Sequence, residues 1–432
     1  MMMTMDPRPS DRALRFVFFL VLAIIGFAPA SASRLLIPMD DSQRDHLKAY
    51  GIAYWTLQRE VPVEWLLNYR GGSFMIDHFE AIERECTIRG VTFQVIAEAQ
   101  ATAILNEIGD PEVNMETVRL EKAPKIAVYA PESFQPWDDA VTMVMEYAEI
   151  PYERIYDREV IAGVIPTYDW LHLHHEDFTG QYGKFWRNYR NAPWYVAMVK
   201  ESEAMAAELG FAKVSEMKLA VALRIRDYVV GGGYLFTMCS GTDSYDIALA
   251  AEGVDICSEV FDGDPIDPRA QEKIDFGRTF AFKDFRLITD PMVYEFSNID
   301  ATDIHGSIGQ TRDFFTLFDF SAKWDVVPTM LCQSHEQVVR GFMGQTTAFR
   351  SALVKPGVTI MGENKAKGTA KYIHGEFGLG QWTFYGGHDP EDYQHMVGDP
   401  PTDLSLHPNS SGYRLILNNI LFPAARKRKQ KT

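Results

Sequence analysis

The chain has 432 residues, of which 46% are hydrophobic and 23% charged, a composition typical of a globular protein with a sizeable core. Its formal net charge of −17 argues against nucleic acid and anionic membrane surfaces as partners. Its four cysteines are too few and too scattered for a disulfide framework in a chain of this length.

The first 32 residues have the pattern of a secretory signal peptide. Arg12 and Arg15 precede an apolar run at 16–27, and small residues follow at 30–32. The run is short for a membrane span. We therefore expect cleavage before Ser33, a periplasmic or extracellular location, and no membrane span in the mature chain.

The segment 33–115 alternates expected strands with expected helices. Strands are expected at 34–39, 63–69 and 92–96, and helices at 42–59, 78–89 and 99–108. This alternation predicts a small N-terminal α/β unit with parallel strands. The polar segment 109–124 has no hydrophobic period and is the expected boundary.

The segment 125–425 is expected to form a larger α/β domain. Its fold class is a doubly wound, mostly parallel sheet, with insertions at about 178–215 and 253–350. The expected strands are 126–129, 152–156, 168–174, 234–238, 280–285, 314–320, 358–361 and 370–385, and a helix is expected at 413–421. The basic tail 426–432 is expected to be a solvated end.

Cys239 stands where a buried strand turns sharply toward a helix expected at 244–252. Ser240 and Gly241 follow the cysteine and permit such a turn. Helix amides behind a thiol favour the thiolate and can hold an oxyanion. Cys239 is therefore a candidate nucleophile, with Ser240 and Gly241 beside the substrate. The alternative is a small buried residue at a strand end.

Two other expected strands end in polar clusters. Because the carboxyl ends of parallel strands converge on one crevice, these clusters are expected to lie near Cys239. A thiol, an imidazole and an orienting carboxylate are the parts of a cysteine hydrolase. The first cluster is His172, His174, His175, Glu176 and Asp177, and the second is Gly387, His388, Asp389 and Glu391.

The elbow cysteine and the late histidine with its acid resemble the class I glutamine amidotransferase-like superfamily, which has a flavodoxin-like core. The resemblance covers roughly 125–422 and implies Cys239 as nucleophile, His388 as base and Glu391 as orienting acid. His388-Asp389-Pro390-Glu391 has one extra residue, which leaves Asp389 as an alternative orienting acid. Glu176, at the oxyanion-loop position, and Gly387 would then face the substrate.

At whole-chain level, the stretches IPMDDSQ, LHLHHEDFTGQYGKF, MCSGTDS and FYGGHDPEDYQH resemble a family of exported bacterial proteins labelled asparagine synthetase B. Synthetase activity is not expected. The stretch 240–244 is one residue shorter than the pyrophosphate loop that such an enzyme needs, and the expected mature N-terminus carries no cysteine.

The function expected from these residues is hydrolysis or transfer at an amide or ester bond by an exported enzyme that needs no cofactor. One alternative is a metal-dependent hydrolase with zinc or a similar ion on His172, His174, His175, Glu176 and Asp177. Another is an envelope protein that binds a glycan or peptide without catalysis.

Overall fold

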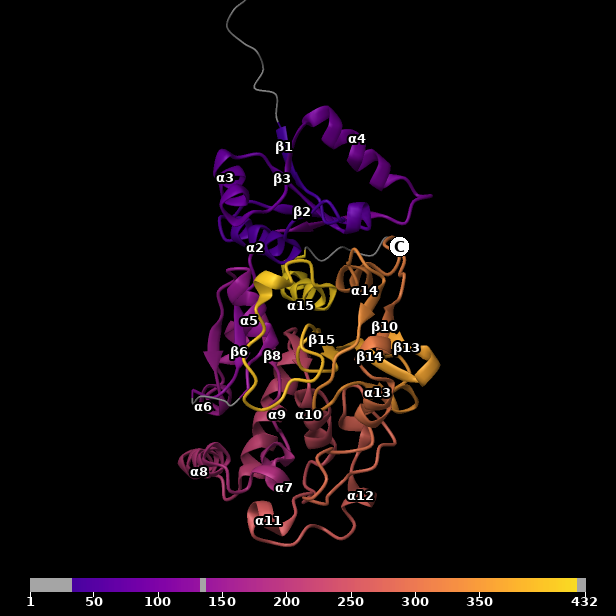
Figure 1. Ribbon diagram of the computed structural model, residues 1–432. Helices are drawn as coiled ribbons and strands as arrows, with labels where there is room; N and C mark the ends of the chain where they lie inside the picture. The colour runs from indigo at the N-terminus through magenta and orange to yellow at the C-terminus, as the bar shows by residue number, and fades with distance from the viewer. Residues whose placement is uncertain (1–32, 133–136, 426–432) are drawn as a thin grey trace, which may run out of the picture.

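The computed structural model describes residues 33–132 and 137–425, so the expected signal peptide at 1–32 and the basic tail at 426–432 lie outside the described residues. In the described part, none of the helices has the length and apolar character needed to cross a membrane. The N-terminal unit caps one end of the larger domain (Figure 1).

The N-terminal unit is an α/β unit, but its five-stranded sheet is antiparallel throughout, in the order β4-β1-β3-β2-β5. The expectation of parallel strands was wrong because two strands were missed. A short connection at 68–72 joins β2 to β3, too short for a parallel crossover. The last strand lies inside the expected boundary segment. The elements are β1 (Ser33–Ile37), α2 (His46–Leu57), β2 (Val63–Leu67), β3 (Ser73–Asp77), α3 (Glu80–Arg89), β4 (Gln94–Ala97), α4 (Glu98–Gly109) and β5 (Glu116–Leu120).

The larger domain contains a ten-stranded mixed sheet with one parallel and one antiparallel half. The parallel half runs β7-β6-β8-β9-β15. The antiparallel half continues from β15 through β14, β13 and β10 to β11, and β12 pairs with β14. The parallel strands are β6 (Ile126–Tyr129), β7 (Glu153–Ile155), β8 (Trp170–Leu173), β9 (Tyr234–Met238) and β15 (Gly380–Tyr385). The others are β10 (Phe314–Leu317), β11 (Val338–Arg340), β12 (Phe349–Arg350), β13 (Thr359–Asn364) and β14 (Thr369–Phe377).

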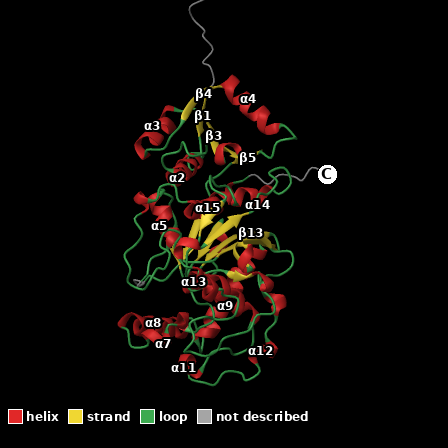
Figure 2. Ribbon diagram, turned by 45° about the vertical axis from the view of Figure 1, so that its right-hand side comes forward, coloured by secondary structure: helices red, strands yellow, loops and turns green. Residues whose placement is uncertain are grey.

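Both faces of the parallel half are buried, which explains why its strands are almost continuously apolar. Val128 and Phe236 face α5 and α15, whereas Ala127 and Leu235 face α9 and α10. Figure 2 shows the sheet between α5 and α15 on one side and α9 on the other. The covering helices are α5 (Ala140–Tyr147), α6 (Asp157–Ile161), α9 (Val214–Val230), α10 (Ser240–Ala250) and α15 (Ser411–Leu421), and α8 (Pro193–Glu208) packs against α9.

The insertion at about 178–215 carries α7 (Trp186–Tyr189) and α8, packed through an aromatic cluster of their own. The segment 253–350 carries α11 (Glu259–Asp262), α12 (Ala270–Lys273), α13 (Thr302–Ile308), α14 (Val326–Leu331) and three strands. The strand expected at 280–285 does not form. The carboxylate of Asp246 instead accepts hydrogen bonds from the amides of Phe280, Ala281 and Phe282, at 2.7, 2.7 and 3.0 Å.

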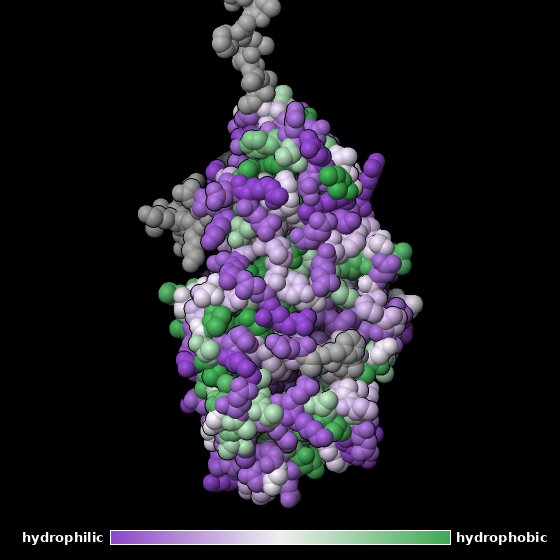
Figure 3. All heavy atoms as spheres, turned by 90° about the vertical axis from the view of Figure 1, so that its left-hand side faces the viewer, coloured by the Kyte–Doolittle hydropathy of each residue, from purple (hydrophilic) through white to green (hydrophobic). Residues whose placement is uncertain are grey.

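The surface over α6 and α8 is largely hydrophilic, with hydrophobic residues in small scattered groups (Figure 3). Trp65 and Trp170 are fully buried core residues, so neither lines a surface groove for a glycan or peptide. Trp137 and Trp194 meet edge to face, with ring centroids 5.3 Å apart.

Candidate active site

Cys239 is the single residue between β9 and α10. Its φ of 51° and ψ of −141° place a non-glycine residue in a costly backbone conformation, about 1–3 kcal/mol above the ordinary regions. The predicted strand–turn–helix elbow is thereby confirmed. Helix α10 begins at Ser240, four residues earlier than expected, so its N-terminal amides lie directly behind the cysteine.

Local hydrogen bonds hold this elbow in place. Thr242 donates to the Cys239 carbonyl from its amide at 3.1 Å and from its hydroxyl at 2.6 Å. The Gly241 amide donates to the carbonyl of His174 at 2.8 Å, and a Cβ at Gly241 would lie 2.2 Å from that oxygen. Gly241, expected beside the substrate, therefore ties the elbow to the end of β8.

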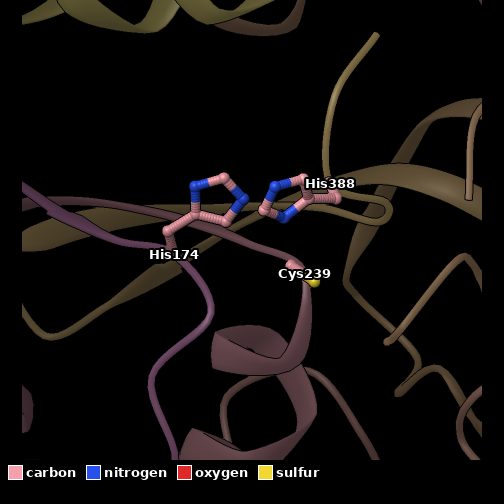
Figure 4. Close-up of side chains that lie close together, drawn as sticks. All are labelled: His174, Cys239 and His388. Carbon is pink, nitrogen blue, oxygen red and sulfur yellow. The ribbon is translucent and has the colours of Figure 1, made fainter. Parts of the chain in front are cut away.

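The thiol of Cys239 lies in a cluster with two imidazoles. Potential ligand atoms of His174, Cys239 and His388 all lie within 4.8 Å of one another. Figure 4 shows the two rings side by side above the start of α10, with centroids 4.6 Å apart. The amide of Gln345 donates to the Cys239 sulfur at 3.3 Å. The structure therefore brings Cys239 and His388 together, with the cysteine only 3% exposed.

Asp138, which the sequence analysis missed, is the carboxylate that orients His388. Its Oδ1 lies 3.4 Å from His388 Nε2 and 3.0 Å from His395 Nε2. Burial raises the pKa of Asp138, but the hydrogen bonds with His388 and His395 outweigh it and lower that pKa below the ordinary value. Asp138 and Asp139 lie in the connection from β6 to α5, and Asp139 caps that helix. A pair of aspartates ahead of an apolar helix was the available signal.

Glu391 and Asp389 do not orient His388, contrary to the expectation. The carboxylate of Glu391 lies 3.1 Å from His407 Nδ1. Asp389 is fully buried and stabilises its own loop, because it accepts from the Glu391 amide at 2.9 Å and from the Thr402 hydroxyl at 2.7 Å. The extra residue in this stretch thus belongs to a loop-capping arrangement.

The charge of His388 is set by opposing effects. Burial lowers the pKa of the imidazole, whereas hydrogen bonds with Asp138 and with the Cys239 thiol raise it, and the net result is a raised pKa. An imidazolium beside a thiol favours the thiolate. The arrangement therefore favours the imidazolium form of His388 next to the Cys239 sulfur.

The residues expected to form one metal cluster face different ways. His172 Nε2 and His174 Nδ1 lie 3.3 and 3.1 Å from the carboxylate of Asp139. The ring of His175 instead meets Trp137 edge to face. Asp177 accepts from the amides of Thr179 and Gly183 at 2.7 and 3.0 Å, which makes it a loop-stabilising residue. The five-residue ligand set is therefore not assembled.

Two further residues expected near the substrate have different surroundings. Ser240 is fully buried, and its hydroxyl has no hydrogen-bond partner among the described residues. Gly387 donates its amide to the Thr346 carbonyl at 2.8 Å and has a φ of +91°, where a side chain would collide with Phe342 and Lys371. The close packing at this position therefore explains why residue 387 is a glycine.

Glu176, the remaining candidate, is buried beside a cavity of about 510 Å³. The cavity reaches the cluster through His175, which lines it and whose ring lies 4.7 Å from that of His174. The other residues around it include Trp137, Tyr156, Asp177, Tyr182, Phe185, Glu201 and Lys218.

Fold and site together define a mixed α/β protein with a cysteine–histidine–aspartate cluster beyond the carboxyl ends of its parallel strands. No family model and no curated protein matches the chain. Among solved structures, the chain is similar to a cytoplasmic protein of Salmonella typhimurium (9% identity, 70% of this chain and 100% of that one, TM-score 0.33). It is also similar to a second cytoplasmic protein of Salmonella typhimurium, with 12% identity over 64% of this chain and 91% of that one, at a TM-score of 0.30. A β-galactosidase from Bacillus circulans has 12% identity over 63% of this chain and 29% of that one, at a TM-score of 0.26.

Proposed function

We propose that the chain is a cysteine hydrolase or transferase that acts on an amide or ester bond. Cys239 is the nucleophile, His388 its base, and Asp138 the residue that positions His388. The observation that carries the proposal is the elbow cysteine, whose sulfur lies within 4.8 Å of a ring nitrogen of His388, while His388 Nε2 faces the partly buried carboxylate of Asp138.

The strand order β7-β6-β8-β9-β15 supports the finer proposal of a flavodoxin-like core similar to the class I glutamine amidotransferases. Export, as expected from residues 1–32, also belongs to the proposal. An envelope protein that binds without catalysis would have no need of the strained thiol.

In the proposed reaction the Cys239 thiolate attacks the carbonyl carbon, and the carbonyl π electrons move to the oxygen. The His388 imidazolium gives its proton to the leaving amine or alcohol as the C–N or C–O bond breaks, which leaves a thioester. His388 then removes a proton from water, or from an acceptor nucleophile, which attacks the thioester and releases Cys239. In this proposal the amide of Ser240 donates to the oxyanion, which its position at the start of α10 supports.

A trapping experiment tests this proposal without knowledge of the natural substrate. The protein is incubated with a panel of activated esters and anilides and analysed intact by mass spectrometry. An acyl adduct on Cys239 is expected, together with turnover that is lost in Cys239→Ala. His388→Ala should form the adduct at least about a hundredfold more slowly. Turnover that survives Cys239→Ala would reject the proposal.

A metal-dependent hydrolase is the second candidate, because Nε2 of buried His174 has no hydrogen-bond partner among the described residues, while its Nδ1 faces Asp139. His174, Cys239 and His388 have the ligand types and proximity for zinc, and Asp139 and Asp138 stand behind the two histidines. A metal there would polarise the carbonyl or activate water. Elemental analysis of protein produced with zinc supplied distinguishes the two candidates. One zinc per chain, lost in His174→Ala, favours the metal-dependent hydrolase, whereas less than about a tenth of a zinc per chain favours the cysteine hydrolase.

A further inference from the structure

The cavity beside the catalytic cluster has an excess of negative charge. It lies among α6, α8, α9 and the segment 175–185. Two permanent cations line it, Arg158 and Lys218. The carboxylates that line it are Glu132, Glu159, Glu176, Asp177, Glu201 and Glu208.

Both cations are already paired with carboxylates. Arg158 contacts Glu208 at 2.7 Å, and the Lys218 ammonium lies 3.0 Å from Asp157, a buried residue outside the cavity lining. Among the described residues, no ion pair joins the remaining acidic groups of the cavity to a cation of the lining.

Glu176 is a buried carboxylate with an uncommitted oxygen at this cavity. It is 9% exposed, and its Oε2 accepts from the Tyr156 hydroxyl at 3.2 Å, while no hydrogen bond among the described residues reaches its Oε1. The Ser244 hydroxyl on α10 donates to the Glu176 carbonyl at 3.0 Å, which fixes this acid relative to the elbow. Burial raises the pKa of Glu176 to about 7. A cation bound beside it would favour the charged form of this carboxylate, which makes Glu176 a suitable anchor for a charged hydrogen-bond donor.

Aromatic rings accompany the carboxylates. Trp137, Tyr182 and Phe185 line the cavity, and the Lys218 ammonium lies 4.4 Å from the ring centroid of Tyr156. Aromatic faces attract cations through their quadrupoles, an interaction that complements a carboxylate. The walls thus offer two kinds of contact to one positively charged group.

We infer that this cavity binds a primary ammonium or guanidinium group of the substrate, so that the scissile bond belongs to a basic amide or ester. His175 lies between the cavity and the reactive groups, with its ring 5.7 Å from that of His388. The cation would occupy the cavity on one side of His175 while the carbonyl carbon reaches Cys239 on the other. This inference rests on the proposed function.

Two measurements on the full chain test the inference separately from the chemistry. The first compares turnover of Nα-acetyl-lysine para-nitroanilide with that of its norleucine counterpart, which lacks only the ammonium. We expect kcat/KM to favour lysine by at least about tenfold, and Glu176→Gln to remove most of this preference. Glu112→Gln, which removes an exposed acid of the N-terminal unit, is the matched control for net charge. This variant should retain the preference for the lysine substrate.

The second measurement is calorimetric binding of Nα-acetyl-lysine methylamide and its norleucine counterpart to Cys239→Ala protein. Binding that discriminates between them and is lost in Glu176→Gln, with no turnover of any substrate, supports the cavity and rejects the proposed function. Turnover without preference for the cation supports the function and overturns the inference. Circular dichroism of Glu176→Gln checks its fold, and Glu201→Gln, at another lining acid, provides a second variant with the same expected direction.

Discussion

Asp138 and His388 are 250 residues apart in the sequence, and their side chains meet with Oδ1 3.4 Å from Nε2. This contact gives the base of the proposed site its orientation. It also lets one carboxylate hold a second histidine, His395, at 3.0 Å. The loop after β6 is thereby joined to the loop after β15.

Replacement of Asp138 should impair the thiol, whereas replacement of Glu391 should not. In Asp138→Asn the imidazolium of His388 loses its carboxylate, so its pKa falls and the thiolate is less favoured. We expect turnover to drop by about 10²–10⁴-fold and the pH midpoint of iodoacetamide labelling to rise by about one unit. Turnover by Glu391→Gln, the matched control, should stay within about threefold of turnover by the unsubstituted protein. Equal losses in the two variants would contradict the assignment of Asp138.

Cys239 should be the most reactive of the four cysteines near neutral pH. Burial raises the pKa of Cys86 to about 12 and also raises the pKa values of Cys257 and Cys332. Cys239 has His388 and the Gln345 amide beside it. Iodoacetamide followed by peptide mass spectrometry should show labelling at Cys239 at least about tenfold faster than at the other three. Labelling of Cys239 only after denaturation would make it a packing residue.

His395 should stabilise the fold more at pH 6 than at pH 10. Its ion pairs with Asp138 and Asp392 raise its pKa to about 9, against the effect of burial. Because the folded-state pKa is raised, this stabilisation is complete below the unfolded value of about 6.5 and disappears as pH rises through about 9. His395→Gln should lower the free energy of unfolding in urea by about 1–2 kcal/mol at pH 6 and by much less at pH 10. His78→Gln, at a partly exposed pair with Glu83, is the control and should show a smaller loss at pH 6. A loss of the same size at both pH values would show that His395 acts through packing.

The mature chain should begin at Ser33. Strand β1 starts at this residue, and Ser33 pairs with Ala97 of β4, so cleavage before Ser33 leaves the sheet complete. N-terminal sequencing of protein recovered from the cell envelope should read Ser-Arg-Leu-Leu. Recovery of uncleaved chain in the membrane pellet would contradict both the cleavage and the export.

The sequence by itself determined which strands end in reactive groups. Cys239, His174 and His388 each follow a parallel strand by one to three residues, and such ends must converge because parallel strands share one carboxyl edge. The elbow at Cys239 could also be predicted from the sequence, because a short apolar strand, a turn of small residues and a helix follow one another without interruption.

Only the tertiary structure decided which carboxylate serves His388. Glu391 is close in sequence but turns toward His407, and Asp389 is held by its own loop, while Asp138 arrives from a different strand. The antiparallel N-terminal sheet was likewise undetermined, because strand direction depends on connections that local patterns do not resolve. Hydrophobic periodicity reports what each segment buries, whereas side-chain partners depend on the paths of loops that carry no period.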